Sequence, residues 1–179
     1  MAARASMAGL ITQLRGLIYD PAGTSQVFSD DELQDACDHY VSLVWHQELE
    51  AAPTYTTSGV VYKQFYANAG NWEADVLLQD ANHATLVPSS SNLVAGYWTF
   101  NDGQEPPVYI TGKHYNLYIA AADILEQWAA REKLTFDFSA DGAQYRRSQK
   151  VEMLLQLAAQ YRLRQRPRTI PQVRGDLAF

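Results

Sequence analysis

The segment Thr111-Gly112-Lys113 is the stretch of this sequence that comes nearest to a phosphate-binding motif. A phosphate-binding loop of this kind starts with a glycine five residues before the second glycine, and a serine or threonine follows its lysine to hold magnesium. Pro107 stands where the first glycine is required, and His114 follows Lys113. The spacing therefore predicts no nucleotide site at this position.

Cys37, His39 and His46 are residue types that bind transition metals, and the helical pattern described below places all three on one helix. On that helix they would spread around the circumference, and no second cluster of such residues supplies further ligands. His83 and His114 each stand alone in the sequence. We therefore expect no metal site and no cofactor.

Paired carboxylates can act as a general acid and a general base, and Asp30-Asp31 is a pair of this kind. The pair falls at an expected helix N-terminus, where capping and the helix dipole account for acidic residues without any chemistry. The sequence also contains no Gly-x-Ser-x-Gly motif of the kind that carries a nucleophilic serine. We therefore expect that this protein is not an enzyme.

The C-terminal segment carries a row of basic residues that suggests binding rather than catalysis. Four arginines follow one another at a spacing of two, at positions Arg162, Arg164, Arg166 and Arg168. In an extended chain this spacing puts their side chains on one side, and Pro167 and Pro171 favour extension. Apolar residues that could dock on a partner come next, at Ile170, Val173, Leu177 and Phe179.

Three interpretations of this segment stay open. It can dock on a partner protein as an added strand or in a groove, or it can be a solvated basic tail. Its arginines can also bind nucleic acid without sequence preference. The third interpretation lacks the interleaved aromatic residues on which proteins that bind single strands stack the bases.

Charge is divided unevenly along the chain, whose net charge is −6. Residues 142–179 contain eight Lys or Arg and two Asp or Glu, whereas residues 1–141 contain six and eighteen. Each phosphate that a basic side chain neutralises adds affinity through counterion release, so an acidic surface would let DNA slide past without sticking. Solvated helices are also commonly acidic, and this plainer interpretation of the charge stays open.

Length and composition predict one soluble globular domain, with 179 residues of which 47% are apolar. No run approaches the roughly 20 apolar residues of a membrane helix, and the N-terminus lacks the separate charged and apolar blocks of a secretory signal. The one cysteine, Cys37, cannot form an internal disulfide, which fits a reducing compartment. We expect assembly in a cytoplasm and no membrane partner.

Apolar residues at three- and four-residue spacings predict two helices near the N-terminus. The first is expected over 6–19, because the residue before Pro21 disfavours helix. The second begins at Ser29, which forms a capping box with Glu32, and its apolar face continues to Val44 and Trp45, with Glu48 facing water.

The same spacing predicts two further helices near the C-terminus. One is expected over 116–133, and the other is marked by Val151, Leu154, Leu155, Ala158 and Tyr161 or Arg162 and is stopped by Pro167. Between the two helical regions, from Thr54 to Thr111, clusters of β-branched and aromatic residues alternate with turn formers. This pattern predicts short strands in hairpins. Its aromatic residues Trp72, Tyr97 and Trp98 are hypothesised to form a partner surface, while tryptophans such as Trp72 and Trp98 also commonly serve as core or subunit-contact anchors.

Several short segments of the chain share their order and spacing with one protein family. Near the N-terminus they are IYDP (18–21) and FSDDEL (28–33); later in the chain they are PPVYITG (106–112), YNL (115–117), AAADILE (120–126), WAA (128–130), DFSADG (137–142) and RSQK (147–150). In these segments the chain resembles the neck adaptor proteins of tailed bacteriophages, which are also called head–tail connector or head completion proteins. The β-rich middle is largely unmatched.

This resemblance implies a structural role. In that family about a dozen copies form a ring beneath the portal, a C-terminal arm grips the portal, and DNA passes through the central hole. The implied partners are the portal protein ring, further copies of this chain in a dodecamer, a downstream stopper or tail protein, and double-stranded genomic DNA that slides through without sequence-specific binding. The implied location is the neck of the virion, after assembly in the cytoplasm of the bacterial host.

Taken together, we expect an α+β protein that is mainly α: a four-helix bundle with a β-hairpin-rich insertion between helices two and three and an extended C-terminal arm. Residues 1–53 would form the N-terminal helices, 54–112 the insertion, 113–165 the C-terminal helices and 166–179 the arm. The residues expected to contact the portal or a neighbouring subunit are Arg147, Arg162, Arg164, Arg166, Arg168, Ile170, Val173, Arg174, Leu177 and Phe179. The alternative function is a nucleic-acid-binding accessory protein that uses the arginine-rich arm.

Overall fold

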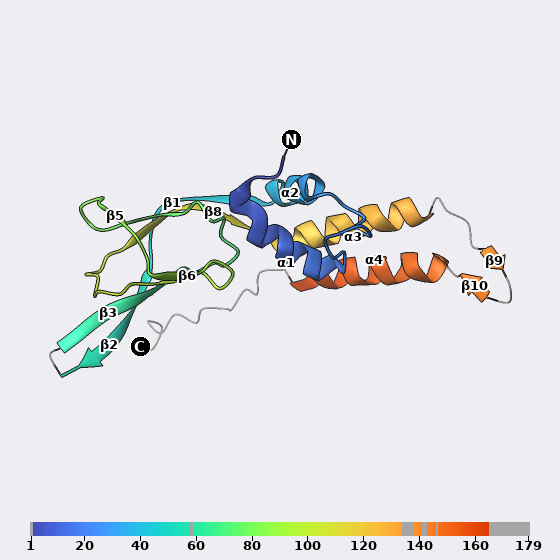
Figure 1. Cartoon of the computed structure of the whole chain (residues 1–179). Coiled ribbons are helices and arrows are strands. Elements are labelled where there is room, and N and C mark those ends of the chain that lie inside the picture. Colours follow the sequence, from blue (N-terminus) through green and yellow to red (C-terminus); the bar gives the residue numbers. More distant parts are fainter. Residues whose placement is uncertain (1, 58, 134–137, 141–142, 146, 165–179) are drawn as a thin grey trace, which may run out of the picture.

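The computed structural model describes residues 2–57, 59–133, 138–140, 143–145 and 147–164. The chain forms an elongated molecule with two parts, which Figure 1 shows side by side. Helices dominate the part on the right, which we call the helical half (the described residues of 2–40 and 116–164). Two β-sheets make up the part on the left, which we call the sheet half (41–115).

The helical half begins with a short 3-10 helix, η1 (Ala5–Met7), that continues into α1 (Ala8–Ile18), close to the predicted 6–19. α1 ends where Tyr19 adopts a left-handed conformation with a φ of 56°. α2 (Asp30–Asp38) begins with the predicted capping box. The Ser29 hydroxyl accepts a hydrogen bond from the Glu32 N–H (3.3 Å), and the Ser29 N–H donates to the Glu32 carboxylate (2.8 Å).

The predicted second helix is wrong beyond Asp38. Residues that were expected to continue it form strand β1 (Val41–Glu48), which pairs antiparallel with β8 (Tyr109–Tyr115). Val44 and Trp45 fit a helical spacing, but Val41, Leu43 and Trp45 also alternate as in a strand. β-branched and aromatic side chains lose rotamer freedom in a helix and suit a pleated surface, and β8 supplies the backbone partners.

The sheet half contains two four-stranded antiparallel sheets. The first has the order β1-β8-β4-β5, with β4 (Leu77–Gln79) and β5 (Thr85–Leu86). The second has the order β2-β3-β7-β6, with β2 (Glu50–Thr56), β3 (Gly59–Tyr66), β6 (Ser90–Asn92) and β7 (Tyr97–Thr99). The outer part of the β2–β3 hairpin extends beyond its sheet in Figure 1, because β7 pairs with β3 only at positions 64–66.

Leu49 carries the chain from the first sheet to the second. It lies between the end of β1 and the start of β2, its side chain is buried, and its N–H donates to the Val108 carbonyl at 2.8 Å. Both sheets contribute to one apolar core, which consists of Leu49, Phe65, Trp72, Leu78, Trp98, Phe100, Val108 and Ile110. The two sheets therefore stabilise each other, which a simple hairpin insertion would not do.

The C-terminal part of the helical half consists of α3 (Leu117–Lys133) and α4 (Arg147–Arg164), with strands β9 (Phe138–Ala140) and β10 (Ala143–Tyr145) between them. α3 and α4 lie side by side (Figure 1), as predicted from their apolar spacing, although α4 begins earlier than Val151. The small residues Ala120, Ala121 and Ala122 of α3 are buried in a core shared with α1, α2 and α4.

The predicted fold class, a mainly α four-helix bundle, is wrong. The described residues do contain four α-helices, but two four-stranded sheets account for most of the chain between Val41 and Tyr115. β8 leads directly into α3, and β1 follows α2 after two residues, so the sheet half is joined to the helical half through the first sheet. The architecture is an α+β fold with a β-rich half rather than a bundle with an insertion.

Candidate interaction surfaces

The buried carboxylate Glu73 ties the N-terminal residues to the sheet half. Glu73 has no exposed surface, and it accepts hydrogen bonds from Arg4 Nε (3.0 Å), from the Ser6 hydroxyl (2.6 Å) and from the Tyr115 hydroxyl (2.6 Å). Arg4 also donates two hydrogen bonds to the Asp38 carboxylate at 2.7 and 2.9 Å. The cluster therefore connects η1, α2 and β8 with the segment before β4.

The electrostatics of this cluster favour a structural role. Burial opposes ionisation of Glu73, but the hydrogen bonds from Ser6, Tyr115 and Arg4 outweigh it and lower the pKa of Glu73 to about 2. Burial and the bond to Glu73 raise the pKa of Tyr115. A general base needs an oxygen that is free to accept a proton, and both Glu73 oxygens already accept hydrogen bonds. The cluster fixes the two halves to each other.

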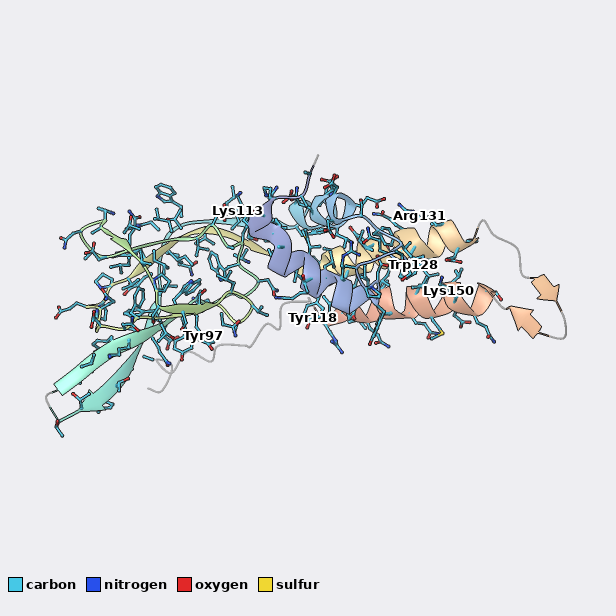
Figure 2. The ribbon with its side chains drawn as sticks, viewed as in Figure 1. Tyr97, Lys113, Tyr118, Trp128, Arg131 and Lys150 are labelled. Atoms are coloured by element: carbon cyan, nitrogen blue, oxygen red, sulfur yellow. The ribbon has the colours of Figure 1, made fainter. Side chains whose placement is uncertain are left out.

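The segment Thr111-Gly112-Lys113 lies within strand β8. The Nζ atom of Lys113 is 3.6 Å from the Glu73 carboxylate. Figure 2 labels Lys113. Gly112 faces Val76: a Cβ added there would come within 2.9 Å of the Val76 side chain. The glycine therefore serves close packing between β8 and the segment before β4.

Arg162 and Arg164 belong to α4, so the extended conformation considered for the arginine row does not apply to these two residues. Arg162 donates to Asp123 (2.6 Å) and Glu126 (2.9 Å) on α3, and the Tyr40 hydroxyl donates to the same Asp123 carboxylate. These bonds, with those to Glu126 first, raise the pKa of the Arg162 guanidinium. Arg162 therefore holds α4 against α3.

The guanidinium of Arg164 lies over the rings of Tyr118 and Tyr161, at 5.9 and 5.8 Å from their centroids. Arg147 is the first residue of α4. The remaining expected interface residues lie outside the described residues: Arg166, Arg168, Ile170, Val173, Arg174, Leu177 and Phe179.

Trp72 and Trp98 are core residues, which corrects the hypothesis that they form a partner surface. They are 1% and 0% exposed, and their rings meet edge to face at 6.0 Å in the core shared by the two sheets. Tyr97 is half-buried and contacts Tyr66 at 5.7 Å between ring centroids. Trp72 and Trp98 thus help to hold the two sheets together.

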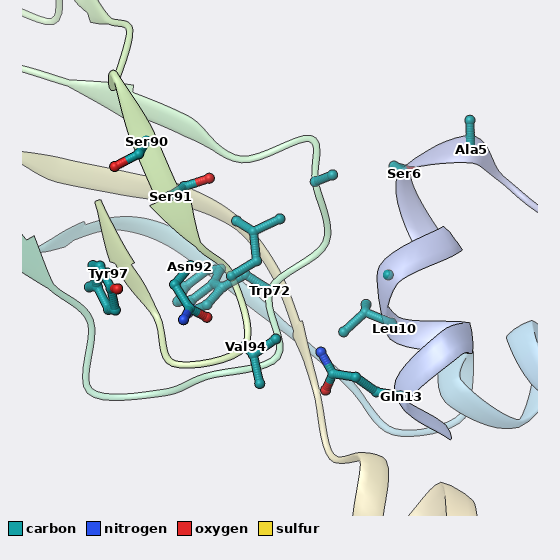
Figure 3. A pocket seen from close by; sticks show the side chains of 13 residues that line it. Ala5, Ser6, Leu10, Gln13, Trp72, Ser90, Ser91, Asn92, Val94 and Tyr97 are labelled. Atoms are coloured by element: carbon teal, nitrogen blue, oxygen red, sulfur yellow. The ribbon is translucent and has the colours of Figure 1, made fainter. Parts of the chain in front are cut away.

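A cavity of about 480 Å³ separates α1 from the loop between β6 and β7 (Figure 3). Ser6, Leu10 and Gln13 line it on the helical side, and Asn92 and Tyr97 line it on the sheet side. The described residues that line this cavity include no charged side chain. Hydroxyl and amide groups beside apolar walls give this cavity a polar but uncharged lining among the described residues.

Apolar side chains of β1 are exposed to solvent. Leu43 is 77% exposed and Trp45 is 84% exposed, and Val41 lies two residues before Leu43 on the same strand. β1 is an edge strand, because it pairs with β8 on one side and with no other described strand on the other side. We call Val41, Leu43 and Trp45 the β1 edge patch. Exposed apolar residues on an unprotected edge strand are typical of an association site.

An apolar groove of about 550 Å³ runs along α4 at the opposite end of the molecule. Its walls include Tyr19, Trp128, Met153, Leu154 and Leu157, and we call it the α4 groove. Lys150 lies at its rim, where Nζ is 4.9 Å from the centroid of the Trp128 ring and 2.7 Å from the Glu132 carboxylate. Figure 2 labels Trp128 and Lys150 between α3 and α4.

Comparisons of this chain with protein-family models, with curated proteins and with solved structures found no match. Among the described residues, no helix is long and apolar enough to cross a membrane. Within the same residues, no group of three or more His, Cys, Asp or Glu is arranged to hold a metal ion.

Sequence reasoning missed both the Glu73 cluster and the β1 edge patch. Arg4 and Glu73 are 69 residues apart, and no local spacing links such residues. The edge patch did leave a signal: Val41, Leu43 and Trp45 recur with the two-residue period of a strand. A segment that fits both periods can be assigned only when its pairing partner is known.

Proposed function

We propose that this protein is a structural adaptor that assembles into a ring at the neck of a tailed bacteriophage. The ring, a dodecamer by the resemblance, docks on the portal ring and extends the channel through which double-stranded DNA passes. It also provides the platform for the next stopper or tail protein. The chain would act in the virion neck after assembly in the bacterial cytoplasm.

One observation carries this proposal: segments that resemble the adaptor family at the two ends of the chain pack against each other. The Phe28 ring meets the Trp128 ring edge to face at 5.9 Å. Arg131 directly follows the WAA segment that contains Trp128. Its guanidinium lies 4.6 Å from the centroid of the Phe28 ring and pairs with the Glu32 carboxylate at 3.0 Å. The matched segments FSDDEL (28–33) and WAA (128–130) thus meet in the helical half, as expected if they belong to one ancestral unit.

The placement of the unmatched residues also supports this proposal. Residues 54–105, where the resemblance is weakest, lie in the sheet half and share an apolar core with Leu49, Val108 and Ile110. This part of the sheet half can vary between relatives while the helices and strand β1 keep the surfaces that build a ring. The β1 edge patch and the α4 groove are exposed apolar surfaces in the two halves of the molecule, and a ring-forming protein needs contact surfaces of this kind.

The described residues give less support to the alternative, a nucleic-acid-binding accessory protein. Arg162 is already paired with two carboxylates of α3, so its charge is not available to a phosphate without breaking those bonds. Arg164 lies over two tyrosine rings. Two of the four arginines in the row therefore have intramolecular partners.

The test mixes the purified chain with the portal ring of the same virus, at a low and a high salt concentration, and determines the mass of the complex. The full-length chain is expected to give a ring-stoichiometric complex, and a chain truncated after Gln165 is expected to give none. Lys63→Ala is the control, because it removes a basic residue from the sheet half and should bind as the full chain does.

The opposite result would be no portal complex, together with DNA binding that weakens steeply as salt rises. Binding of that kind measures the number of phosphates neutralised, and it would replace the adaptor proposal with the nucleic-acid alternative.

A further inference from the structure

The β1 edge patch and the α4 groove lie at opposite ends of the elongated molecule. In Figure 1, β1 belongs to the sheet half on the left, and the outer part of α4 lies on the right, near β10. Figure 2 places Trp128 and Lys150, which belong to the groove and its rim, in that right-hand part. One copy of the chain therefore cannot bring its own edge patch to its own groove.

The two surfaces are complementary in shape and polarity. The edge patch projects two large apolar side chains, Leu43 and Trp45, from an edge strand. The groove is concave and has apolar walls, and its Met153 is 69% exposed. Methionine adapts its unbranched side chain to the shape of a partner, and a volume of about 550 Å³ is large enough for a tryptophan side chain.

The charges of the two regions are opposite in sign. The sheet half, residues 41–115, contains seven Asp or Glu and two Lys or Arg. The two helices beside the groove, α3 and α4, together contain six Lys or Arg and four Asp or Glu, and Lys150 at the groove rim is paired with Glu132 at 2.7 Å. Glu48 and Glu50 flank Leu49 near the edge patch and are exposed. Opposite charges on two approaching surfaces steer them together and fix their register.

We propose that the α4 groove of one copy receives the β1 edge patch of the next copy, with Trp45 seated against Trp128 and Met153. This inference rests on the proposed ring and specifies which surfaces build it. The contact is heterologous, because two different surfaces meet, so every copy still offers a free groove or a free patch after binding. Heterologous contacts close into rings when the rotation between copies permits it.

The test uses two single substitutions, each of which blocks one surface. Trp45→Glu places a charge in the edge patch, and Met153→Lys places a charge in the groove. Sedimentation velocity over a range of protein concentrations measures self-association. The wild-type chain is expected to associate, and each variant alone is expected to associate at least about tenfold more weakly, as for the loss of a central interface residue.

Mixing the two variants gives the decisive result. Trp45→Glu keeps an intact groove, and Met153→Lys keeps an intact edge patch, so a 1:1 mixture is expected to form a dimer that cannot grow further. Recovery of this dimer also shows that both variants are folded. Two exposed apolar residues outside these surfaces serve as controls: Val87→Glu in the sheet half and Leu155→Lys on α4 should associate as the wild type does.

Three outcomes would overturn the inference. A wild-type chain that remains monomeric at every concentration would do so. A mixture of the two variants that gives no dimer would also do so. Loss of association with Trp45→Glu but not with Met153→Lys would indicate that two edge strands pair with each other instead.

The portal experiment separates this inference from the proposed function. If Trp45→Glu still forms a ring-stoichiometric complex with the portal, the ring uses other surfaces, and the adaptor proposal stands without this inference. If the mixed variants form their dimer but the wild-type chain forms no portal complex, the contact is real and the adaptor proposal fails.

Discussion

Arg4 and Glu73, which are 69 residues apart in the sequence, form an ion pair with 3.0 Å between Arg4 Nε and Glu73 Oε1. Glu73 is fully buried, whereas the Arg4 side chain is 38% exposed. The ion pair therefore links the N-terminal residues of the helical half to a buried carboxylate of the sheet half. Its loss should lower the stability of both halves.

Glu73→Gln is expected to lower the free energy of unfolding by about 3 kcal/mol, because breaking a buried ion pair leaves its remaining partners poorly compensated. Urea unfolding followed by tryptophan fluorescence measures the change. Asp75→Asn is the matched control: its side chain is 50% exposed and 4.0 Å from Lys113, so the cost should stay under about 0.5 kcal/mol. Equal effects of the two substitutions would contradict this role for Glu73.

The same carboxylate predicts a pH dependence of stability. The pKa of Glu73 lies at about 2 in the folded chain, below its ordinary value of 4.5. The unfolded chain therefore binds this proton first as pH falls, so the stabilisation is complete above about pH 5 and is lost progressively toward pH 2.

Thermal unfolding of the wild type and of Glu73→Gln, measured at about pH 6 and about pH 3, checks this expectation. The two unfolding midpoints should lie far apart at the higher pH and close together at the lower pH. A gap that stays constant would show that the pKa of Glu73 is the same in the folded and the unfolded chain.

Trp72 and Trp98 offer a comparison of two buried indoles. Trp72 Nε1 donates to the Ala69 carbonyl at 2.7 Å, whereas Trp98 Nε1 is buried and has no hydrogen-bond partner among the described residues. Trp72→Phe and Trp98→Phe remove similar volumes from the same core. Trp72→Phe should cost about 1 kcal/mol more, because it also leaves the Ala69 carbonyl unpaired. Unfolding in urea compares the two variants, and a larger cost for Trp98→Phe would reverse this order.

Cys37 is expected to be unreactive in the folded chain. Its side chain is fully buried on α2, and burial, followed by the Asp38 charge, raises the pKa of its thiol to about 12. Labelling with a thiol reagent at neutral pH should therefore proceed only as fast as the chain opens, and it should accelerate across the urea transition. Rapid labelling without denaturant would contradict the packing of α2.

Arg162→Ala should destabilise the α3–α4 pair. Arg162, Asp123 and Glu126 are partly exposed (42%, 28% and 44%), so solvent screening limits the expected loss to about 1 kcal/mol. Unfolding in urea measures the loss, and Lys133→Ala, at the exposed end of α3, is the control. If Arg162→Ala instead left stability unchanged, its pairing with α3 would contribute nothing measurable.

The helices were largely predictable because their signals are local. The capping box of Ser29 and Glu32 requires residues three apart, and the apolar stripes of α1 and α3 repeat every three or four residues. The strand at Val41–Glu48 was not predictable in the same way. Its residues fit both periods, and pairing with β8, about seventy residues later in the chain, decided between them.

The candidate site was less predictable than the fold because burial depends on distant partners. Aromatic residues in short strands give no sign of which sheet face they occupy, and Trp72 and Trp98 are buried only because two sheets face each other. Leu43 and Trp45 are exposed for the converse reason, since no described strand pairs with the outer edge of β1. Likewise, the spacing of the arginine row and the prolines Pro167 and Pro171 favoured an extended chain, whereas Arg162 and Arg164 complete a helix.

The single residue between β1 and β2 has a mechanical consequence. Because Leu49 is buried and its N–H is bonded to Val108, the two strands meet at an anchored corner with no slack in the backbone. A displacement of the projecting β2–β3 hairpin is therefore transmitted through Leu49 to β1, because no flexible residue lies between the two strands. Binding of a partner at Tyr55, which is exposed near the hairpin tip, is therefore expected to displace β1, the strand that carries Leu43 and Trp45.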